Sequence, residues 1–573
     1  MVLEYSTGIL STIPSNLVVL VEIGLMIIVA SIFAYLVKIL KQPLMPAYIF
    51  TGILIGPLVL GLIKDIYLIE SLSYIGAAFL IFIAGLEIKL SKLKEVGSVS
   101  SIGGVFQIGI LLFISFFIAL ALGFVGKEPI YIALVVAFSS TMVVVKLLSD
   151  KRSINSLHGR IIIGILLFQD IAAIIAMTIL TSDFSTSSIL ISVLKAIIFA
   201  VAAFLLAIGI RPVLKVSAKN QELLLLVSIS ILFLFAIGSI FAELSIIIGA
   251  FFAGVALANS DYKIDIEGKI APLRDFFAVI FFVALGMRLE LIPLKFVTIL
   301  LLLIFMVMII KPLTIMFIVR LFGYKKITSF LSANALAQTS EFSLIIVTTG
   351  LTLGHISNHL FSTIVLLTVI TMSLSTYLIT NEKKLYNIFS SPLNFLESFH
   401  SKREKSLEYI KDDGRKVLIF GCHRMGSLFL KEFEKEKENV LVIDYNPEII
   451  RSLIEKKIPC IYGDLSNKEV LEKAKIGDAE TVISTIPDFE ENLMLIKKTR
   501  ELNKKALIFI VADRISEALD LYKNGADYVI LPQVIGGQKG FEIIKSIKNG
   551  QISVKQLKKQ HLNYLNSIHH ILY

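Results

Sequence analysis

Residues 159–174 read GRIIIGILLFQDIAAI. The stretch is apolar except for Arg160 at its start and the neighbouring pair Gln169 and Asp170. Asp170 follows Arg160 by ten residues, which is about 15 Å along a helix that rises 1.5 Å per residue. Basic residues mark the ends of membrane-spanning helices, so Asp170 is expected near the middle of the bilayer. Ionisable groups at that depth are costly, and they are usually functional.

The sequence around this stretch has the composition of a membrane protein. Of the 573 residues, 56% are apolar and 17% are charged, whereas soluble domains carry about 25% charged residues. Between Asn16 and Thr380, apolar runs of about 20 residues, enough to cross a bilayer, follow one another. The stretch 221–259 could also form a re-entrant pair. We expect thirteen spans, at about 17–40, 44–62, 72–90, 98–125, 130–149, 160–180, 187–210, 221–241, 244–259, 271–287, 296–319, 327–351 and 359–380.

The basic residues between the spans predict the orientation. With the N-terminus outside, the inner loops hold 18 lysines and arginines and the outer loops hold 4. Inner loops carry the excess of basic residues in membrane proteins, so the C-terminal part is expected in the cytoplasm of a multi-pass cell-membrane protein. Because membrane topology explains this basic excess, it does not indicate a nucleic-acid partner.

The pattern changes after residue 380. A charged connector, 381–413, is followed by short β-rich runs that alternate with amphipathic helices, beginning with KVLIFG at 416–421. Such alternation is typical of a doubly wound parallel sheet. The sequence therefore predicts a multi-pass α-helical membrane protein followed by an α/β Rossmann-like domain. The expected division is 1–380 (membrane domain), 381–413 (connector), 414–535 (Rossmann-like domain) and 536–573 (C-terminal tail, beginning with a helix).

Polar clusters interrupt two distant spans. One is AFSSTMVVV, with Ser139, Ser140 and Thr141, and the other is ALAQTSEFSL, around residues 338–341. Paired interruptions indicate the binding site of a transporter built from inverted repeats. Hydrogen bonds between neighbouring helices are the alternative interpretation. Lys311 is a second ionisable residue within a span, and a buried ion pair would be a structural reason for it and Asp170.

A buried carboxylate that faces a watery cavity can hold a proton or a small cation, but not both well. This competition is the minimum machinery for exchanging a proton for a cation. Gln169 offers a neutral carbonyl where a second carboxylate could stand. A single titrating site favours one proton per cation, and therefore electroneutral exchange. The residues expected to form the ion and proton site are Asp170, Gln169, Lys311, Ser139, Ser140 and Thr141.

The cytosolic part carries a candidate nucleotide site. Its first strand runs into a G-x-x-x-x-G turn from Gly421 to Gly426, and Asp444 ends the second strand, where a carboxylate would bind ribose hydroxyls. His423 replaces the glycine that lets a pyrophosphate approach, which leaves AMP, ATP and NAD(H) open and also a fold that binds nothing. The candidate residues are Gly421, His423, Arg424, Met425, Gly426, Asp444, Gly463 and Asp464.

The sequence resembles the monovalent cation:proton antiporter-2 family, and within it the Kef-type potassium antiporters with a C-terminal TrkA-N (RCK) domain. The resemblance spans about 20–380 and 415–535. It rests on QPLMPAYIFTGILIGPLVLGL, AFLIFIAGLEIKL, AFSST, GRIIIGILLFQDIAAI, IIIGAFFAGVALA, FFVALGMRLEL, KPLTIMFIVRLFG and LAQTSEFSLII, of which the LLFQD run is the most specific.

The resemblance implies an inverted-repeat fold with a mobile core and a dimerisation domain, and hence a homodimer. It implies that Asp170 and Gln169 form the ion and proton site, that residues 139–141 belong to a broken helix, and that Lys311 is the basic residue paired with the site. The Gln-Asp pair is the form of potassium-type members, and the nucleotide domain would gate transport. Glutathione-binding residues cannot be matched.

The expected function is therefore electroneutral exchange of K⁺ for H⁺ across the lipid bilayer, gated by an adenine nucleotide. A sodium/proton antiporter is the main alternative. A nucleotide-gated potassium channel is disfavoured because no TVGYG-like filter is present. A membrane oxidoreductase is disfavoured because no second catalytic domain is visible, so neither enzymatic activity nor a bound metal is expected.

Overall fold

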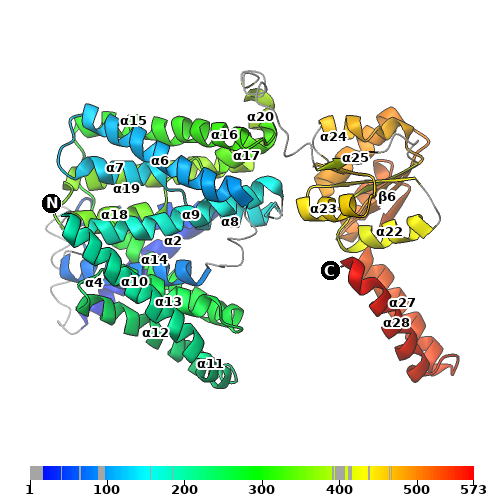
Figure 1. The fold of residues 1–573 in the computed structure, drawn as a ribbon, viewed down its shortest axis with the longest axis horizontal. Helices are drawn as coiled ribbons and strands as arrows, with labels where there is room; N and C mark the ends of the chain where they lie inside the picture. The colour runs from blue at the N-terminus through cyan, green and yellow to red at the C-terminus, as the bar shows by residue number, and fades with distance from the viewer. Residues whose placement is uncertain are drawn as a thin grey trace. The chain divides into compact units, whose positions relative to one another are not determined.

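The computed structural model describes residues 17–40, 42–63, 66–87, 97–151, 153–154, 156–182, 185–389, 393, 407–410, 416–435, 439–463, 465 and 468–572. The chain divides into two compact units. The first contains nearly all residues up to Phe399, and the second contains His400–Tyr573. Figure 1 shows the first unit as a bundle of helices and the second as a sheet flanked by helices.

The first unit is entirely helical within its described residues. Its helices are α2 (Val18–Ile39), α3 (Leu44–Ile55), α4 (Ile66–Glu87), α6 (Gly97–Ala121), α7 (Glu128–Ala137), α8 (Thr141–Asp150), α9 (Leu157–Leu180), α10 (Thr186–Gly209), α11 (Arg211–Ser217), α12 (Gln221–Phe241), α13 (Ile246–Ala258), α14 (Lys263–Met287), α15 (Leu294–Phe305), a π-helical turn η1 (Met306–Ile310), α16 (Lys311–Leu321), α17 (Lys326–Ala335), α18 (Glu341–Thr352), α19 (Asn358–Thr380) and α20 (Glu382–Phe389).

Each predicted span coincides with one helix or with consecutive helices of the first unit. Nine helical stretches of the described chain are long and apolar enough to cross a bilayer. Four shorter apolar stretches, namely α3, the Ser73–Glu87 part of α4, α13 and α18, lie within the other four predicted spans. The stretch 221–259 forms two helices, α12 and α13, joined by a short turn. Two helices joined by a turn are compatible with two separate spans and with a re-entrant pair.

The helices pack in two ways. Helix α10 leaves large apolar side chains such as Leu190 and Phe204 exposed, as a lipid-facing helix does. Helices α4 and α13 instead approach each other backbone to backbone. A Cβ added to Gly254 would lie 2.1 Å from the carbonyl oxygen of Phe82, so only glycine fits at this crossing.

Two spans are broken in the middle. Helix α7 ends at Ala137 and α8 begins at Thr141, while α17 ends at Ala335 and α18 begins at Glu341. In Figure 1, α7 and α18 lie towards one end of the bundle and α8 and α17 towards the other, so the two broken spans run in opposite directions. The C-terminal ends of two half-helices and the N-terminal ends of two others therefore meet inside the bundle.

The second unit contains a seven-stranded sheet. Its strands are β1 (Glu408–Tyr409), β2 (Val417–Phe420), β3 (Val440–Asp444), β4 (Cys460–Tyr462), β5 (Thr481–Ser484), β6 (Leu507–Val511) and β7 (Tyr528–Ile530). Their order is β1-β4-β3-β2-β5-β6-β7, and only β1 is antiparallel to its neighbour.

Helices cover both faces of this sheet, which is why β2 and β3 are buried along their whole length. In Figure 1, α22 and α23 lie on one side of the sheet and α24 and α25 on the other. The helices are α22 (Arg424–Lys435), α23 (Pro447–Glu455), α24 (Lys468–Lys473), a 3-10 turn η3 (Ile476–Asp478), α25 (Phe489–Leu502), α26 (Ile515–Lys523), α27 (Pro532–Lys548) and α28 (Val554–Leu572).

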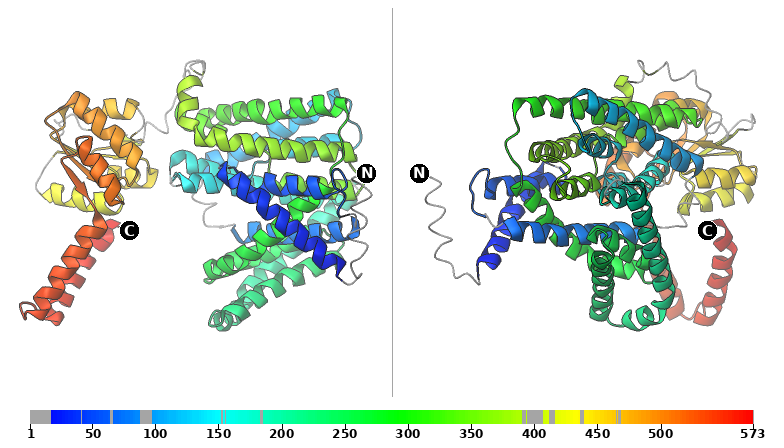
Figure 2. Two further views of the ribbon diagram at one scale, coloured as in Figure 1. Left: turned by 180° about the vertical axis from the view of Figure 1, so that it is seen from behind. Right: turned by 60° about the vertical axis from the view of Figure 1, so that its left-hand side comes forward.

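The segments expected outside the two main domains contain more regular structure than the sequence predicts. The segment 381–413 contains helix α20, which is tied to the bundle by a 2.8 Å ion pair between Glu382 and Lys151, and strand β1, which extends the sheet. The segment 536–573 forms most of two helices, α27 and α28, which appear as a hairpin in Figure 2. The helix expected in 536–573 is present, and a second helix occupies the region expected to be a tail.

Candidate functional site

The non-helical residues of the two broken spans form hydrogen bonds with each other. The hydroxyl of Ser139 donates to the carbonyl of Leu336 at 3.0 Å, and the hydroxyl of Ser140 donates to the Glu341 carboxylate. The side chain of Gln338 reaches the carbonyl of Ser140 at 3.5 Å. Residues about 200 positions apart thereby satisfy polar groups that neither broken helix can satisfy alone.

Lys311 lies at the point where the two preceding half-helices end. Its Nζ donates to the carbonyls of Phe138 and Gln338, both at 2.7 Å. These carbonyls follow the C-terminal ends of α7 and α17, where the helix dipoles are negative. The π-helical turn η1 directly precedes Lys311, and such turns often occur at functional positions in helices.

The pairing of Lys311 with Asp170, which the family resemblance implies, is not formed in this structure. Among the described residues, Lys311 has no carboxylate within ion-pair distance, and its hydrogen bonds go to backbone carbonyls. The reason is the break itself, since two helix ends expose carbonyls that need a donor in a region without water. This requirement cannot be read from the sequence around Lys311.

Asp170 lies beside the N-terminal end of α8. Its two carboxylate oxygens are 3.2 and 3.1 Å from the hydroxyl of Thr141, the first residue of α8. Within the described part of the chain, Thr141 is the only hydrogen-bond donor to this carboxylate. Asp170 is therefore held near a positive helix N-terminus by a hydroxyl that can rotate, which leaves its remaining lone pairs for a proton or a cation.

The side-chain amide of Gln169 binds groups next to the break between α7 and α8, so it is not available as a ligand beside Asp170. Its Oε1 accepts a 2.9 Å hydrogen bond from the backbone N–H of Ser139, and its Nε2 donates to Gln107 at 2.8 Å. Gln107 in turn donates to the carbonyl of Ala137 at 3.2 Å. The interpretation of Gln169 as an ion ligand is thus not supported by its contacts, because both ends of the amide bind protein groups.

Two residues that complete the crossing, Gln107 and Ser375, were not expected from the sequence, and Glu341 was expected only as a member of the second polar cluster. Gln107 connects Gln169 to the end of α7, and Glu341 receives the Ser140 hydroxyl. Ser375 on α19 donates to the side-chain oxygen of Gln338. The available signal for Gln107 was that it is the one amide side chain in the apolar span 98–125, and membership of the second polar cluster was the signal for Glu341.

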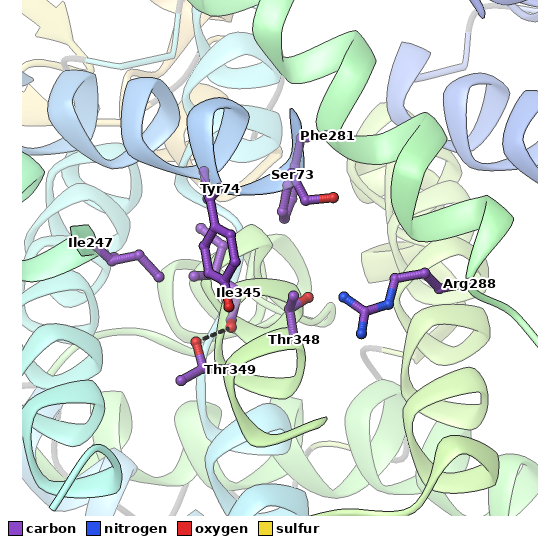
Figure 3. A pocket seen from close by; sticks show the side chains of 9 residues that line it. Ser73, Tyr74, Ile247, Phe281, Arg288, Ile345, Thr348 and Thr349 are labelled. Atoms are coloured by element: carbon purple, nitrogen blue, oxygen red, sulfur yellow. Dashed lines mark hydrogen bonds between the residues drawn. The ribbon is translucent and has the colours of Figure 1, made fainter. Parts of the chain in front are cut away.

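A small cavity lies elsewhere in the bundle, between α4, α13, α14 and α18. Figure 3 shows Tyr74 and Thr349 on its wall and the guanidinium of Arg288 pointing towards Thr348. A fixed positive charge repels a cation, so this cavity is a poor cation site. The half-helix crossing, with its carboxylates and hydroxyls, is the better candidate.

The loop predicted to bind a nucleotide has the expected backbone in the second unit. Gly421 takes a φ of +85°, which favours glycine. A Cβ on Gly426 would lie 1.9 Å from the Gly421 carbonyl oxygen, so the turn into α22 requires both glycines. The loop follows β2, which lies between β3 and β5, the switch point at which such sheets bind ligands.

Asp444 ends β3 beneath this loop. One carboxylate oxygen accepts a 2.6 Å hydrogen bond from the backbone N–H of Cys422, and the other accepts a 2.7 Å bond from that of Asn446. Burial raises the pKa of Asp444 above its ordinary value, and these backbone hydrogen bonds oppose that rise. Asp444 therefore fixes the shape of the loop.

The other predicted nucleotide residues are placed as follows. His423 is exposed in the loop, and Arg424 and Met425 begin α22. Gly463 follows β4 and is buried against the side chain of Val470. Asp464 lies outside the described residues.

Comparisons with known proteins agree with this architecture. Residues 27–380 match the family described as sodium/hydrogen exchanger, transmembrane, and residues 417–532 match the TrkA-N domain, a nucleotide-binding regulatory domain. The chain is 24% identical over 579 residues to an Escherichia coli (strain K12) protein named "Putative cation/proton antiporter YbaL", covering 96% of this chain and 100% of that protein.

Two further matches concern the membrane unit. K(+) efflux antiporter 5 of Arabidopsis thaliana is 31% identical over 353 residues, which cover 59% of this chain and 62% of that protein. The sodium proton antiporter MjNhaP1 from Methanocaldococcus jannaschii matches in structure with a TM-score of 0.50 and 17% identity, over 65% of this chain and 98% of that chain. The structural match supports the antiporter fold. With more than half of its residues matched by the family model, the chain belongs to the sodium/hydrogen exchanger family of transmembrane proteins and carries a TrkA-N domain.

Proposed function

We propose that this protein exchanges K⁺ for H⁺ across the membrane, one for one, without an enzymatic step. The observation that supports this most strongly is the state of Asp170. Its carboxylate is 7% exposed, lies where two broken helices cross, and is bound by one hydroxyl. A carboxylate so weakly engaged can release a proton and accept a cation in its place, which is the competition that exchange requires.

Potassium is favoured over sodium by the relatives. K(+) efflux antiporters of Arabidopsis thaliana and glutathione-regulated potassium-efflux proteins KefC align with 56–79% of this chain. The position next to Asp170 is an amide, Gln169, so this region carries one carboxylate fewer than one with two adjacent acids. A lower charge density suits the larger and more weakly hydrated cation. Sodium/proton exchange remains the alternative outcome of the test.

The TrkA-N domain is proposed to regulate the exchange by binding an adenine nucleotide, AMP, ATP or NAD(H), at the loop from Gly421 to Gly426. This loop leads directly into the N-terminus of α22, and helix N-termini favour bound phosphate groups. The distribution of basic residues supports a cell membrane location with the N-terminus outside and the TrkA-N domain in the cytoplasm. The working unit is proposed to be a homodimer, as the family resemblance implies.

Purified protein in proteoliposomes tests the exchange. A proton gradient is imposed, and K⁺, Na⁺, Li⁺ or Rb⁺ is added in turn while an enclosed dye reports pH. Collapse of the gradient by K⁺ at lower concentration than by Na⁺ supports the proposal, and the reverse order supports the sodium alternative. Absence of collapse with every cation, in protein that is folded and oriented, contradicts the exchange itself.

A further inference from the structure

Glu341 is a buried carboxylate that the exchange described so far does not use. It is the first residue of α18 and is 7% exposed, the same as Asp170. One of its oxygens accepts a hydrogen bond from Ser140, and the next residue, Thr141, donates to Asp170. Consecutive hydroxyls at the start of α8 therefore hold two carboxylates.

Within the described residues, Lys311 is the positive side chain that contacts this crossing. Lys311 is fully buried, and its two bonds to carbonyl oxygens are 2.7 Å long, the length of hydrogen bonds from a charged ammonium. The crossing thus contains a lysine at the carbonyl ends of two half-helices and two carboxylates at the N–H ends of the other two. Each charge lies where the helix dipoles favour it.

We propose that Glu341 is the fixed counter-charge of Lys311, and that this balance couples the movement of the cation to that of the proton. The inference rests on the proposed function. With Lys311 and Glu341 cancelling each other, Asp170 alone decides the net charge of the site. The site is neutral when Asp170 holds either K⁺ or a proton, and it carries one negative charge when empty.

The coupling follows from the cost of moving charge through a low-dielectric region. A neutral, loaded site can change its exposure from one side to the other. An empty site carries a negative charge, which makes this change of exposure unfavourable. The site therefore changes back to its first exposure only after it has bound a proton or another cation. Without the Glu341 charge, the empty site would be neutral and free to return, while the loaded site would carry an unbalanced positive charge.

The test replaces Glu341 in the full-length protein and measures flux and current together. In proteoliposomes, a dye reports proton movement, and a solid-supported membrane electrode reports the net current after a K⁺ jump. The wild type is expected to exchange without current. Glu341→Gln is expected to exchange at least about tenfold more slowly, since each 1.4 kcal/mol on a barrier is a factor of ten, and to show a K⁺ current that proton movement does not match.

Two further variants separate charge balance from a structural role at the start of α18. Glu341→Asp keeps the charge and is expected to exchange without current. The double variant Lys311→Met/Glu341→Gln removes both charges, leaves the empty site negative through Asp170, and is expected to recover coupled exchange relative to either single variant. If Glu341→Gln fails to fold, the comparison of Lys311→Met with the double variant decides the question.

Two results would overturn the inference. One is current-free exchange at the wild-type rate in folded Glu341→Gln. The other is a double variant that performs no better than Lys311→Met alone, which would limit Glu341 to stabilising the helix end. A wild type without any cation-dependent proton movement would contradict the proposed function instead, so the two failures are distinguishable.

Discussion

Asp170 in the membrane unit and Asp444 in the TrkA-N domain are equally buried carboxylates with different partners. Asp170 is 7% exposed and Asp444 is 5% exposed. Asp444 accepts hydrogen bonds from the backbone N–H groups of Cys422 and Asn446. Asp170 accepts only from the hydroxyl of Thr141 within the described residues. Burial is therefore not what distinguishes them.

The two carboxylates differ in whether their hydrogen-bond donors can rotate away from them. Backbone N–H groups are fixed by the fold, so Asp444 is an acceptor that shapes a loop and keeps its partners. A hydroxyl can rotate and can itself accept, so the hydrogen bond of Asp170 is the more exchangeable one, as the proposed exchange requires. The comparison suggests that a transport carboxylate is recognised by exchangeable donors more than by depth.

The largest effect is expected from Asp170→Asn. The amide keeps an oxygen for the Thr141 hydroxyl, so the fold should be retained, but it neither titrates nor balances a cation. We expect cation-dependent proton movement in proteoliposomes to fall by at least about 100-fold, the scale of losing a group that transfers protons. Unchanged gel-filtration and thermal unfolding profiles serve as the control. Retained exchange would remove Asp170 from the site.

Asp444→Asn tests the fixed carboxylate of this comparison, and we expect it to destabilise the TrkA-N domain. The amide nitrogen cannot accept, so one of the two backbone N–H groups at Cys422 and Asn446 loses its partner. A buried donor left unsatisfied costs about 1–3 kcal/mol. We expect calorimetry of the full-length protein to show earlier unfolding of the TrkA-N domain and weaker adenine nucleotide binding. Basal exchange without nucleotide should remain, and its loss would contradict the purely regulatory assignment.

Thr141→Val sharpens the comparison by removing the rotating donor. The β-branched shape is kept, so packing changes little. One hydrogen bond to a carboxylate is worth about 1.5–3 kcal/mol in general, but the cation replaces it during transport, so we expect only an approximately threefold to tenfold change in the K⁺ concentration for half-maximal exchange. Thr141→Ser, which keeps the hydroxyl, is the matched control. Identical behaviour of the valine and serine variants would show that this contact is irrelevant.

The smallest expected effect is on the thermal stability that His355 contributes in a loop outside the spans. In the loop after α18, His355 Nε2 lies 2.7 Å from Lys127 Nζ, and Nδ1 lies 2.8 Å from the Tyr131 hydroxyl. The lysine can only donate, so Nε2 accepts and the ring is neutral. Burial, and secondarily the charge of Lys127, lower the pKa of His355 below its ordinary value.

Since the fold favours neutral His355, the stability that this residue adds is present above its ordinary pKa near 6.5 and is lost as the pH falls towards the lower, folded value. We expect the wild type to lose about 1–3 °C of thermal stability relative to His355→Gln between pH 7.5 and 5.5. The midpoint difference between the two proteins, measured at both pH values, is the observable. A difference that does not depend on pH would mean that His355 is not held neutral by Lys127.

The sequence alone was sufficient for the architecture. Apolar runs gave the positions of thirteen spans, and the polar clusters at 139–141 and 338–341 gave the positions of both breaks. The glycines at 421 and 426 predicted the tight turn after β2. These features are local, because hydrophobic length, backbone freedom and the cost of a polar group in an apolar run are properties of short stretches.

Only the tertiary structure decided which polar groups meet. Ser140 and Glu341 are 201 positions apart and are in contact, Lys311 binds the carbonyls of Phe138 and Gln338, and Gln169 turns to the backbone of Ser139. The physical reason is that a broken helix exposes backbone groups that no water can satisfy within the membrane. Nearby side chains are recruited to satisfy them, and which ones come near depends on how the two broken spans cross.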